Sequence, residues 1–228
     1  MKNTIFRGFA GVLVVLFLLT QGVFAQELLQ THEISDKVGQ TQTVCGVVAG
    51  SYLAKNVDKT PYYINIDAAW PESPFLLVSG GQGVNRLPME SLKVGQPVCA
   101  TGMIESSPRS GKPYILVMDA AQLKMVDLRV SAAEAVQHVG HFVTITGKVA
   151  GASYAEGLEK KPTFLNLDNP FPIDPALIVI NQDRRPLFGE PEKSLLGKTI
   201  SVTGIVQKSE NGRAVIDLIW PSQLRVEP

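Results

Sequence analysis

Residues 161–179 read KPTFLNLDNPFPIDPALIV, and residues 60–78, 101 positions earlier, read TPYYINIDAAWPESPFLLV. In each copy, a run that alternates apolar with other residues ends at an aspartate, passes an aromatic residue followed by proline, and leads into a second apolar run. Alternation with a period of two residues is typical of a half-buried strand, and proline-rich segments are typical of turns. Each copy therefore predicts two adjacent β-strands, and the chain contains a duplication.

The duplication extends over nearly the whole chain. Residues that match at the same offset are Gly39 with Gly140, Gly46 with Gly147, Gly50 with Gly151, Asp67 with Asp168, Pro71 with Pro172 and Pro74 with Pro175. The offset then changes by one residue, so that Gly102 matches Gly204, and returns to 101 at Gln122 and Gln223. A repeat of about 100 residues has the length of a domain and exceeds that of a solenoid unit. We predict two similar domains, residues 26–126 and 127–228.

The first 25 residues differ in composition from the rest. Lys2 and Arg7 precede an uncharged apolar run at 8–19, and Val23 and Ala25 provide small residues where a signal peptidase cuts. We predict a signal peptide at 1–25 and export to the periplasm or the medium. The alternative is a retained membrane anchor, which needs about 20 apolar residues. No cysteine near the junction could carry a lipid, so we expect no stable membrane anchor after cleavage.

The mature chain carries almost no net charge. The full sequence has 21 Lys and Arg residues and 21 Asp and Glu residues, and removal of Lys2 and Arg7 leaves 19 basic residues. Binding that is driven mainly by phosphate neutralisation requires clustered cations. A nucleic-acid partner would therefore have to be bound by local basic patches.

Apolar runs and turn signals predict five strands in each copy, preceded by a short helix. The first strands are expected at 43–49 and 142–150, the fourth at 96–104 and 199–206, and the fifth at 114–118 and 214–219. Internal glycines in the first and fourth strands predict bends or bulges. For the helices, Ser131 and Glu134 form a capping-box signature before Gly140, and Ile34 and Val38 before Gly39 form a weaker version.

This arrangement of strands resembles the OB-fold, a small closed Greek-key barrel. The resemblance is carried by residues 140–149, GHFVTITGKV, and residues 197–206, GKTISVTGIV. Both are similar to strands of the OB modules in single-strand binding proteins and in modules appended to tRNA synthetases, nucleases and helicases. The resemblance implies an all-β protein of two tandem five-stranded barrels. It implies little about the ligand, because OB barrels bind nucleic acids, sugars and proteins. The joint at 123–130, LKMVDLRV, lacks glycine, proline and serine, so we expect the barrels to pack at a defined angle.

The two cysteines lie on strands that are neighbours in an OB barrel. Cys45 precedes the glycine of the first strand, and Cys99 precedes that of the fourth. In an exported protein this favours a disulfide, and the matching residues Thr146 and Ser201 are also small and polar. Two unpaired thiols are the alternative. We expect no metal site, because no other soft ligand has suitable spacing, and no cofactor.

The second strand of each copy separates two sets of side chains by parity. Ile64, Ile66, Leu165 and Leu167 share one parity and are expected in the core. The opposite parity carries Tyr63, Asn65 and Asp67, and in the second copy Phe164, Asn166 and Asp168. The OB resemblance makes this outer face a binding platform, on which aromatic rings stack and amides read polar edges. Alternatively, the rings pack against other elements and the acidic residues cap the following turn, and a carboxylate there would repel phosphate.

Basic residues occur in the loops next to this face. Lys55 and Lys59 follow Tyr52, Lys160 and Lys161 follow Tyr154, and the loops between the fourth and fifth strands carry the remaining candidates. The complete set of candidate ligand-binding residues is Tyr63, Asn65, Phe164, Asn166, Lys55, Lys59, Lys160, Lys161, Arg109, Lys112, Lys208 and Arg213. Acidic residues such as Asp58 and Glu159 lower the local potential, and loop lysines that are only solvated are the alternative. Arg184 and Arg185 form a further basic pair after the third strand.

No catalytic motif is present in the sequence. His138 and His141 are separated by Gly140, which is expected to end the helix between them, and the glycines at 80–83 precede no phosphate-binding helix. Two hypotheses follow. The first is an exported, non-enzymatic protein that binds an extended polymer, with single-stranded nucleic acid as the specific candidate. The second is a structural or interaction module of the cell envelope that binds a protein or a cell-wall glycan. The fold resemblance favours the first, and the near-neutral charge favours the second.

Overall fold

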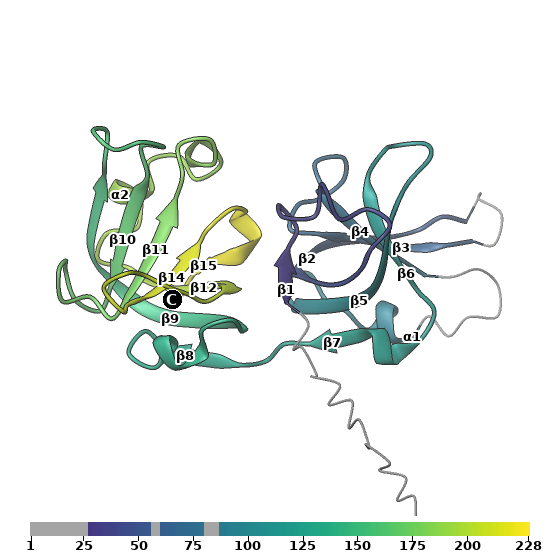
Figure 1. The fold of residues 1–228 in the computed structure, drawn as a ribbon, viewed down its shortest axis with the longest axis horizontal. Coiled ribbons are helices and arrows are strands. Elements are labelled where there is room, and N and C mark those ends of the chain that lie inside the picture. The colour runs from purple at the N-terminus through teal and green to yellow at the C-terminus, as the bar shows by residue number, and fades with distance from the viewer. Residues whose placement is uncertain (1–26, 56–59, 80–86) are drawn as a thin grey trace, which may run out of the picture.

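The computed structural model describes residues 27–55, 60–79 and 87–228, which form two β-rich bodies lying side by side (Figure 1). The predicted signal peptide lies outside the described residues. The prediction of an all-β protein is confirmed, because the helices in the described part are at most four residues long. None of these helices has the length and apolar character needed to cross a membrane.

The first body is a closed barrel. Its elements are β1 (Leu28–Gln30), β2 (Thr41–Leu53), β3 (Tyr62–Ile66), β4 (Phe75–Ser79), α1 (Leu87–Glu90), β5 (Pro97–Ser106), β6 (Pro113–Val117), η1 (Ala120–Gln122) and β7 (Leu123–Met125). The strand order is β1-β2-β3-β4-β6-β5-β7, and β5 pairs back with β2 to close five strands. Strands β4 and β6 are parallel, and the other neighbours in the barrel are antiparallel. We call this body the first barrel.

The second body repeats the strand order without complete closure. Its elements are β8 (Arg129–Ser131), η2 (Ala135–His138), β9 (Phe142–Tyr154), β10 (Thr163–Leu167), β11 (Ala176–Ile180), η3 (Arg185–Leu187), α2 (Pro191–Ser194), β12 (Thr199–Ile205), β13 (Gln207–Lys208), β14 (Ala214–Asp217), η4 (Pro221–Gln223) and β15 (Leu224–Val226). The order is β13-β14-β11-β10-β9-β12-β15. On the side away from β11, β14 pairs with the two-residue strand β13, and Val206, which belongs to neither strand, separates β13 from β12. The expected second closed barrel is therefore a half-barrel sheet, which we call the second half-barrel.

Each body has its own core, and the predicted parity of the second strand is confirmed. Ile64 and Ile66 lie in the core of the first barrel, and Leu165 and Leu167 lie in that of the second half-barrel. All four are almost completely buried. Burial of a side chain of this size stabilises a fold by about 1.5–3 kcal/mol, so these strands are fixed with one face inward.

The predicted opening helices are wrong for the first copy and only partly right for the second. Residues 31–40 form turns, and the second copy has only the 3-10 turn η2. The capping box itself forms: the Ser131 N–H donates to Glu134 Oε2 at 3.1 Å, and the Glu134 N–H donates to Ser131 Oγ at 3.4 Å. The reason is topological, because β1 pairs in parallel with β2 and β8 with β9. About ten residues must reverse the chain twice between them, which leaves no length for a helix.

The predicted bulges are confirmed where the second strand meets the first. The pairing register shifts between Val48 and Gly50 in the first copy, and between Asn166 and Leu167 in the second. A Cβ atom added to Gly46 would lie 2.3 Å from Ile66 Cγ2. The close approach of β2 to β3 thus requires glycine at this position.

The predicted disulfide between Cys45 and Cys99 is confirmed, with a Cα–Cα distance of 4.0 Å. At the matching position in the second half-barrel, the Thr146 and Ser201 hydroxyls are hydrogen-bonded at 2.8 Å. The disulfide is buried together with Phe142 of the second half-barrel, and Leu28, Val126 and Ile205 pack around them. The disulfide therefore lies at the joint between the two bodies.

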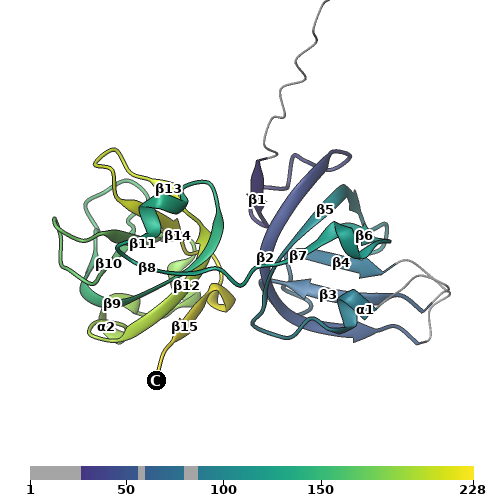
Figure 2. The same cartoon turned by 90° about the horizontal axis from the view of Figure 1, so that it is seen from below.

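Polar contacts complete this joint. The Gln223 side chain donates from Nε2 to Gln30 Oε1 at 3.1 Å, and the Ser222 hydroxyl donates to the backbone carbonyl of Asp67 at 2.6 Å. Figure 2 shows η4, in yellow, next to β2 of the first barrel, with the segment between β7 and β8 connecting the bodies. The second half-barrel is thus joined to the first barrel by the connecting segment, an apolar cluster and two hydrogen bonds.

Candidate ligand-binding surface

Three tyrosines lie on the outer face of the first barrel. Tyr52 of β2 and Tyr63 of β3 are directly opposite each other in the antiparallel ladder, which places their side chains on the same side of the sheet. That side is opposite to Ile64 and therefore faces away from the core. Tyr52 is 62% exposed, and Tyr63 is half-buried.

Tyr114 of β6 lies on the same face, as the pairing of β4 with both β3 and β6 shows. Leu76 of β4 pairs with both Asn65 and Tyr114, so Tyr114 shares the parity of Asn65 and Tyr63. The Tyr114 hydroxyl donates to Glu105 Oε2 at 2.7 Å. This hydrogen bond, with smaller contributions from burial and from the charges of Glu105 and Tyr63, raises the pKa of Tyr114 to about 12. The ring is therefore neutral at physiological pH. We call Tyr52, Tyr63 and Tyr114 the tyrosine face.

The first barrel also has an exposed aromatic residue with a cation beside it. Trp70, in the connection between β3 and β4, is 56% exposed. The Lys112 Nζ atom lies 5.5 Å from the centre of the Trp70 ring and donates to the Ser73 carbonyl at 2.7 Å. Lys112 lies two residues before Tyr114 in the chain.

The second half-barrel repeats this unit with different residues. Phe171, at the position that matches Trp70, is 67% exposed. The Arg213 guanidinium lies 5.5 Å from the centre of the Phe171 ring, and its Nη1 is 2.6 Å from the buried Asp174 Oδ1. Both aromatic residues precede a cis proline, Pro71 or Pro172.

The predicted amides and carboxylates are placed differently from the rings. Asn65 and Asn166 have the expected parity but are buried, so they do not present their amides to solvent. In the second copy, the chain that follows β10 covers this position: a Cβ added to Gly151, the partner of Asn166, would lie 3.4 Å from Pro170 Cα. Strand parity alone predicts the side of a sheet and not its coverage by a loop.

The two aspartates bind the preceding strand at the bulge, whereas the alternative interpretation of the sequence expected them to cap the following turn. The Val47 N–H donates to Asp67 Oδ1 at 2.7 Å, and the Lys148 N–H donates to Asp168 Oδ1 at 2.9 Å. Asp168 is exposed, whereas Asp67 is only 4% exposed and also accepts a hydrogen bond from the Thr31 hydroxyl at 2.6 Å. Burial raises the pKa of Asp67 to about 6, although both hydrogen bonds act to lower it.

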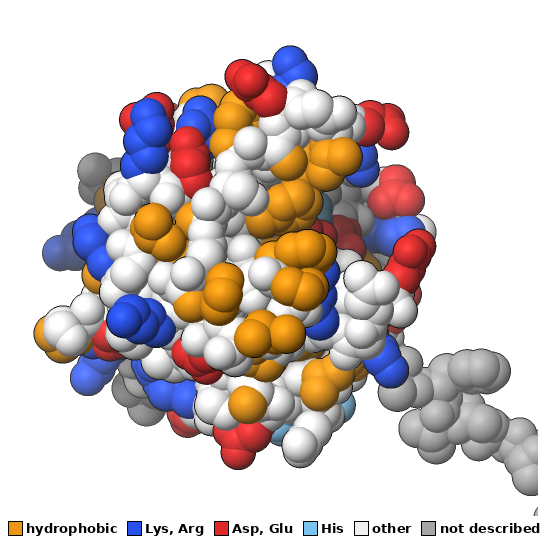
Figure 3. All heavy atoms as spheres, turned by 90° about the vertical axis from the view of Figure 1, so that its left-hand side faces the viewer, with side chains coloured by type: hydrophobic (Ala, Val, Ile, Leu, Met, Phe, Trp, Pro, Cys, Tyr) orange, Lys and Arg blue, Asp and Glu red, His pale blue; other side chains and the backbone are white. Residues whose placement is uncertain are grey.

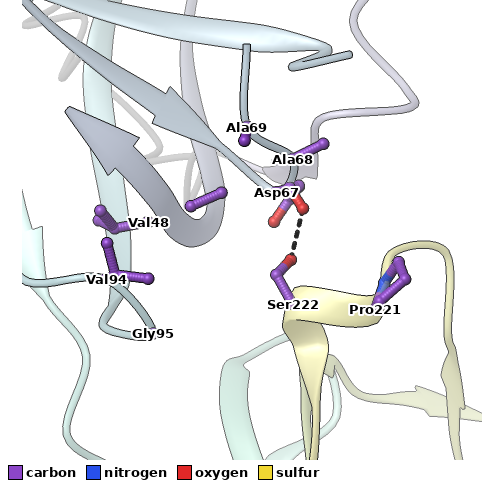
Figure 4. A pocket seen from close by; sticks show the side chains of 9 residues that line it. Val48, Asp67, Ala68, Ala69, Val94, Gly95, Pro221 and Ser222 are labelled. Carbon is purple, nitrogen blue, oxygen red and sulfur yellow. Dashed lines mark hydrogen bonds between the residues drawn. The ribbon is translucent and has the colours of Figure 1, made fainter. Parts of the chain in front are cut away.

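Asp67 also borders a pocket at the joint. The pocket has a volume of about 320 Å³ and is lined mainly by small apolar side chains, with Pro221 and Ser222 contributed by the second half-barrel (Figure 4). The hydrogen bond from Ser222 to the Asp67 carbonyl crosses it. Because the carboxylate oxygens of Asp67 are engaged by Val47 and Thr31, the pocket offers few free polar groups.

The candidate basic residues differ in whether they are held in contacts within the protein. Lys112 and Arg213 are held in the intramolecular contacts described above, and Lys59 lies outside the described residues. The side chains that remain exposed are Lys55, Arg109, Lys160, Lys161 and Lys208. Arg184 and Arg185 lie over Trp220 and Tyr154, respectively, and pair with Asp183 and Glu192. At the end of the molecule formed by the second half-barrel, basic and acidic side chains alternate around a hydrophobic centre (Figure 3).

The two histidines are neighbours in space. The rings of His138 and His141 lie edge to face, with their centres 6.2 Å apart. Within the described ranges, no three His, Cys, Asp or Glu side chains gather in a way that could hold a metal ion.

The sequence interpretation missed Trp70, Phe171 and Tyr114. A signal for the first two was present in the repeat, because an aromatic residue before proline is followed 42 positions later by a cation in both copies, at Lys112 and Arg213. Tyr114 has no aromatic counterpart, since Val215 matches it in the second copy.

Comparison with known proteins identifies no family. The sequence matches no protein-family description and no curated protein. Among solved structures, the chain is similar to the p204 HINb domain (8% identity, 85% of this chain and 100% of that chain, TM-score 0.34). It is also similar to a replication protein A heterotrimer bound to ssDNA (12% identity, 82% of this chain and 49% of that chain, TM-score 0.32). A third is the single-stranded DNA binding protein from Thermus aquaticus (9% identity, 84% and 94% coverage, TM-score 0.25). Similarities at this level do not establish a relationship in function.

Proposed function

We propose that this protein is an exported, non-enzymatic binding protein composed of two OB domains, and that the tyrosine face binds an extended polymer. Single-stranded nucleic acid is the ligand that we propose. The observation that carries this proposal is the placement of Tyr52, Tyr63 and Tyr114 from three strands on one outer face, with Tyr52 62% exposed.

The physical argument rests on stacking. Aliphatic side chains such as Ile64 and Ile66 fill the core of the barrel, and the three tyrosines are not part of it. Rings on an outer face instead offer flat apolar surfaces, and each stacked base contributes about 1–3 kcal/mol in proteins that bind single strands. Such stacking tolerates any base sequence, since every base has a flat face. The exposed Lys55 and Arg109 supply positive charge in loops of the same barrel.

The second half-barrel offers a weaker version of this surface. Ser153 of β9 stands opposite Phe164 of β10, where the first barrel has two opposed tyrosines. Val215 pairs with Leu177, in the place that Tyr114 occupies in the first barrel. The binding surface that we propose therefore belongs to the first barrel.

The test is fluorescence anisotropy of labelled oligothymidylate with the mature protein. We expect the double variant Tyr52→Ala/Tyr63→Ala to weaken binding by about 10- to 100-fold, because about 1.4 kcal/mol corresponds to a factor of ten. Phe164→Ala is the matched control in the second half-barrel and should have a smaller effect. Unchanged affinity in the double variant, with its circular dichroism spectrum preserved, would show that the tyrosine face is not the binding surface.

A specific observation favours a second candidate, an envelope module that binds a cell-wall glycan. Arg185 and Arg213 are neutralised by Glu192 and Asp174. These contacts reduce the positive charge that is available for phosphates, whereas a neutral sugar ring needs only stacking and hydrogen bonds. Binding of peptidoglycan fragments that does not weaken between low and high salt, without binding of oligonucleotides, would support this candidate instead.

A further inference from the structure

Each body contains an aromatic ring with a cation beside it: Trp70 with Lys112 in the first barrel, and Phe171 with Arg213 in the second half-barrel. The two pairs are built in the same way. Trp70 and Phe171 occupy matching positions in the connections from β3 to β4 and from β10 to β11. Each ring has a cation 5.5 Å from its centre. In each unit this cation is also anchored to the residue three positions after the ring, Ser73 or Asp174.

The geometry is kept although the chemistry differs. In the first barrel a lysine is anchored to a backbone carbonyl, and in the second half-barrel an arginine is anchored to a buried carboxylate. The contact with Ser73 or Asp174 holds the cation against the ring, and the cation in turn holds the ring in its orientation. Cation–π contacts of this kind contribute about 0.5–1 kcal/mol at exposed sites. The cation therefore holds each ring in place at the surface of the protein, outside the core.

Both rings remain more than half exposed in spite of this support. Aromatic side chains are among the largest contributors of buried apolar area in proteins, and apolar area left in water forgoes about 25 cal/mol per Å². Neither Trp70 nor Phe171 is part of a core cluster. A supported ring with an open surface is suited to receiving another ring from a ligand.

The charge of the two units differs in a way that indicates the ligand. Among the ion pairs of the described residues, none includes Lys112, whereas Arg213 is paired with Asp174. The unit around Trp70 thus keeps a positive charge next to an aromatic ring. A nucleotide presents the matching pair of groups, a base that stacks and a phosphate that is attracted to the ammonium group.

We infer that Trp70 and Phe171 are a pair of stacking positions, one in each body, and that one strand of nucleic acid contacts both. This inference rests on the proposed function and extends it, because it makes the second half-barrel part of the binding surface. The two bodies pack against each other at the joint through the disulfide, Phe142 and the Ser222 hydrogen bond.

The experiment is a length series of labelled oligothymidylates measured by anisotropy. One OB fold covers about 4–16 nucleotides, so short oligomers reach one ring and longer ones reach both. We expect Phe171→Ala to lower the ratio of long-oligomer to short-oligomer affinity by about tenfold. Trp70→Ala should weaken binding at every length, and Phe171→Tyr should restore the ratio.

Ile173→Ala is the matched control, because Ile173 is 70% exposed and lies two residues after Phe171 but has no ring. It should leave the ratio as in the wild type. An unchanged ratio in Phe171→Ala, with binding still sensitive to the tyrosine face, would overturn this inference and leave the proposed function standing. A drop that is equal at all lengths would also overturn it. If no oligonucleotide binds at all, both the inference and the nucleic-acid proposal are wrong.

Discussion

Replacement of Asp67 with asparagine tests how the joint between the two bodies affects stability. The Asp67 carboxylate is buried and accepts hydrogen bonds from the Val47 N–H and the Thr31 hydroxyl. Burial raises its pKa from 3.8 to about 6. The folded protein therefore binds this proton more tightly than the unfolded chain does.

The sign and size of the effect follow from linkage. Below about pH 4 the carboxyl is protonated in both states, and its contribution to stability is fully present. As the pH rises from about 4 to about 6, the unfolded chain loses the proton first, so the free energy of unfolding falls. The interval between 3.8 and about 6 corresponds to roughly 3 kcal/mol, at 1.36 kcal/mol per pH unit. An asparagine carries no charge at any pH and can still accept from Val47.

The assay is urea unfolding of the oxidised protein between pH 4 and pH 8, followed by near-UV circular dichroism. We expect Asp67→Asn to be more stable than the wild type at pH 8, by up to about 3 kcal/mol, and to lose most of the fall in stability across this range. Asp168→Asn is the matched control, because Asp168 holds the same bulge but is exposed. If Asp67→Asn retained the pH dependence of the wild type, the buried carboxylate would not be its source.

Two further changes test the strands beneath this joint. Reduction of the Cys45–Cys99 disulfide, which spans 54 residues, should lower the free energy of unfolding by up to about 4 kcal/mol. Urea titrations with and without reductant measure this difference. Equal unfolding midpoints in the two titrations would contradict the prediction. Gly46→Ala should destabilise the protein by about 1–3 kcal/mol, because the added Cβ would lie 2.3 Å from Ile66. Gly147→Ala should cost less, since its nearest contact is 3.0 Å, and thermal melts that ranked the two variants in the opposite order would refute this reasoning.

The parts of the fold that could be predicted from the sequence depend on periodicity and on the repeat. Alternation placed Ile64 and Leu165 in the cores, and matching strand positions predicted the disulfide, because these features are determined within one strand or between strands of known order. The burial of Asn65 could not be predicted, because parity gives the side of a sheet and not its coverage by another segment. The missing ladder pairing at Val206 was also not predictable, since it concerns one residue inside an apolar run.

The differences between the two copies are informative where the bodies meet. Phe142, which packs on the disulfide, matches Thr41 in the first copy, and the disulfide itself matches the hydrogen-bonded pair of Thr146 and Ser201. Each copy therefore carries, at the joint, an apolar group that the other copy lacks. A flexible pair of independent barrels would not need such complementary changes, because neither surface would be buried. The joint is thus built into the sequence of both copies.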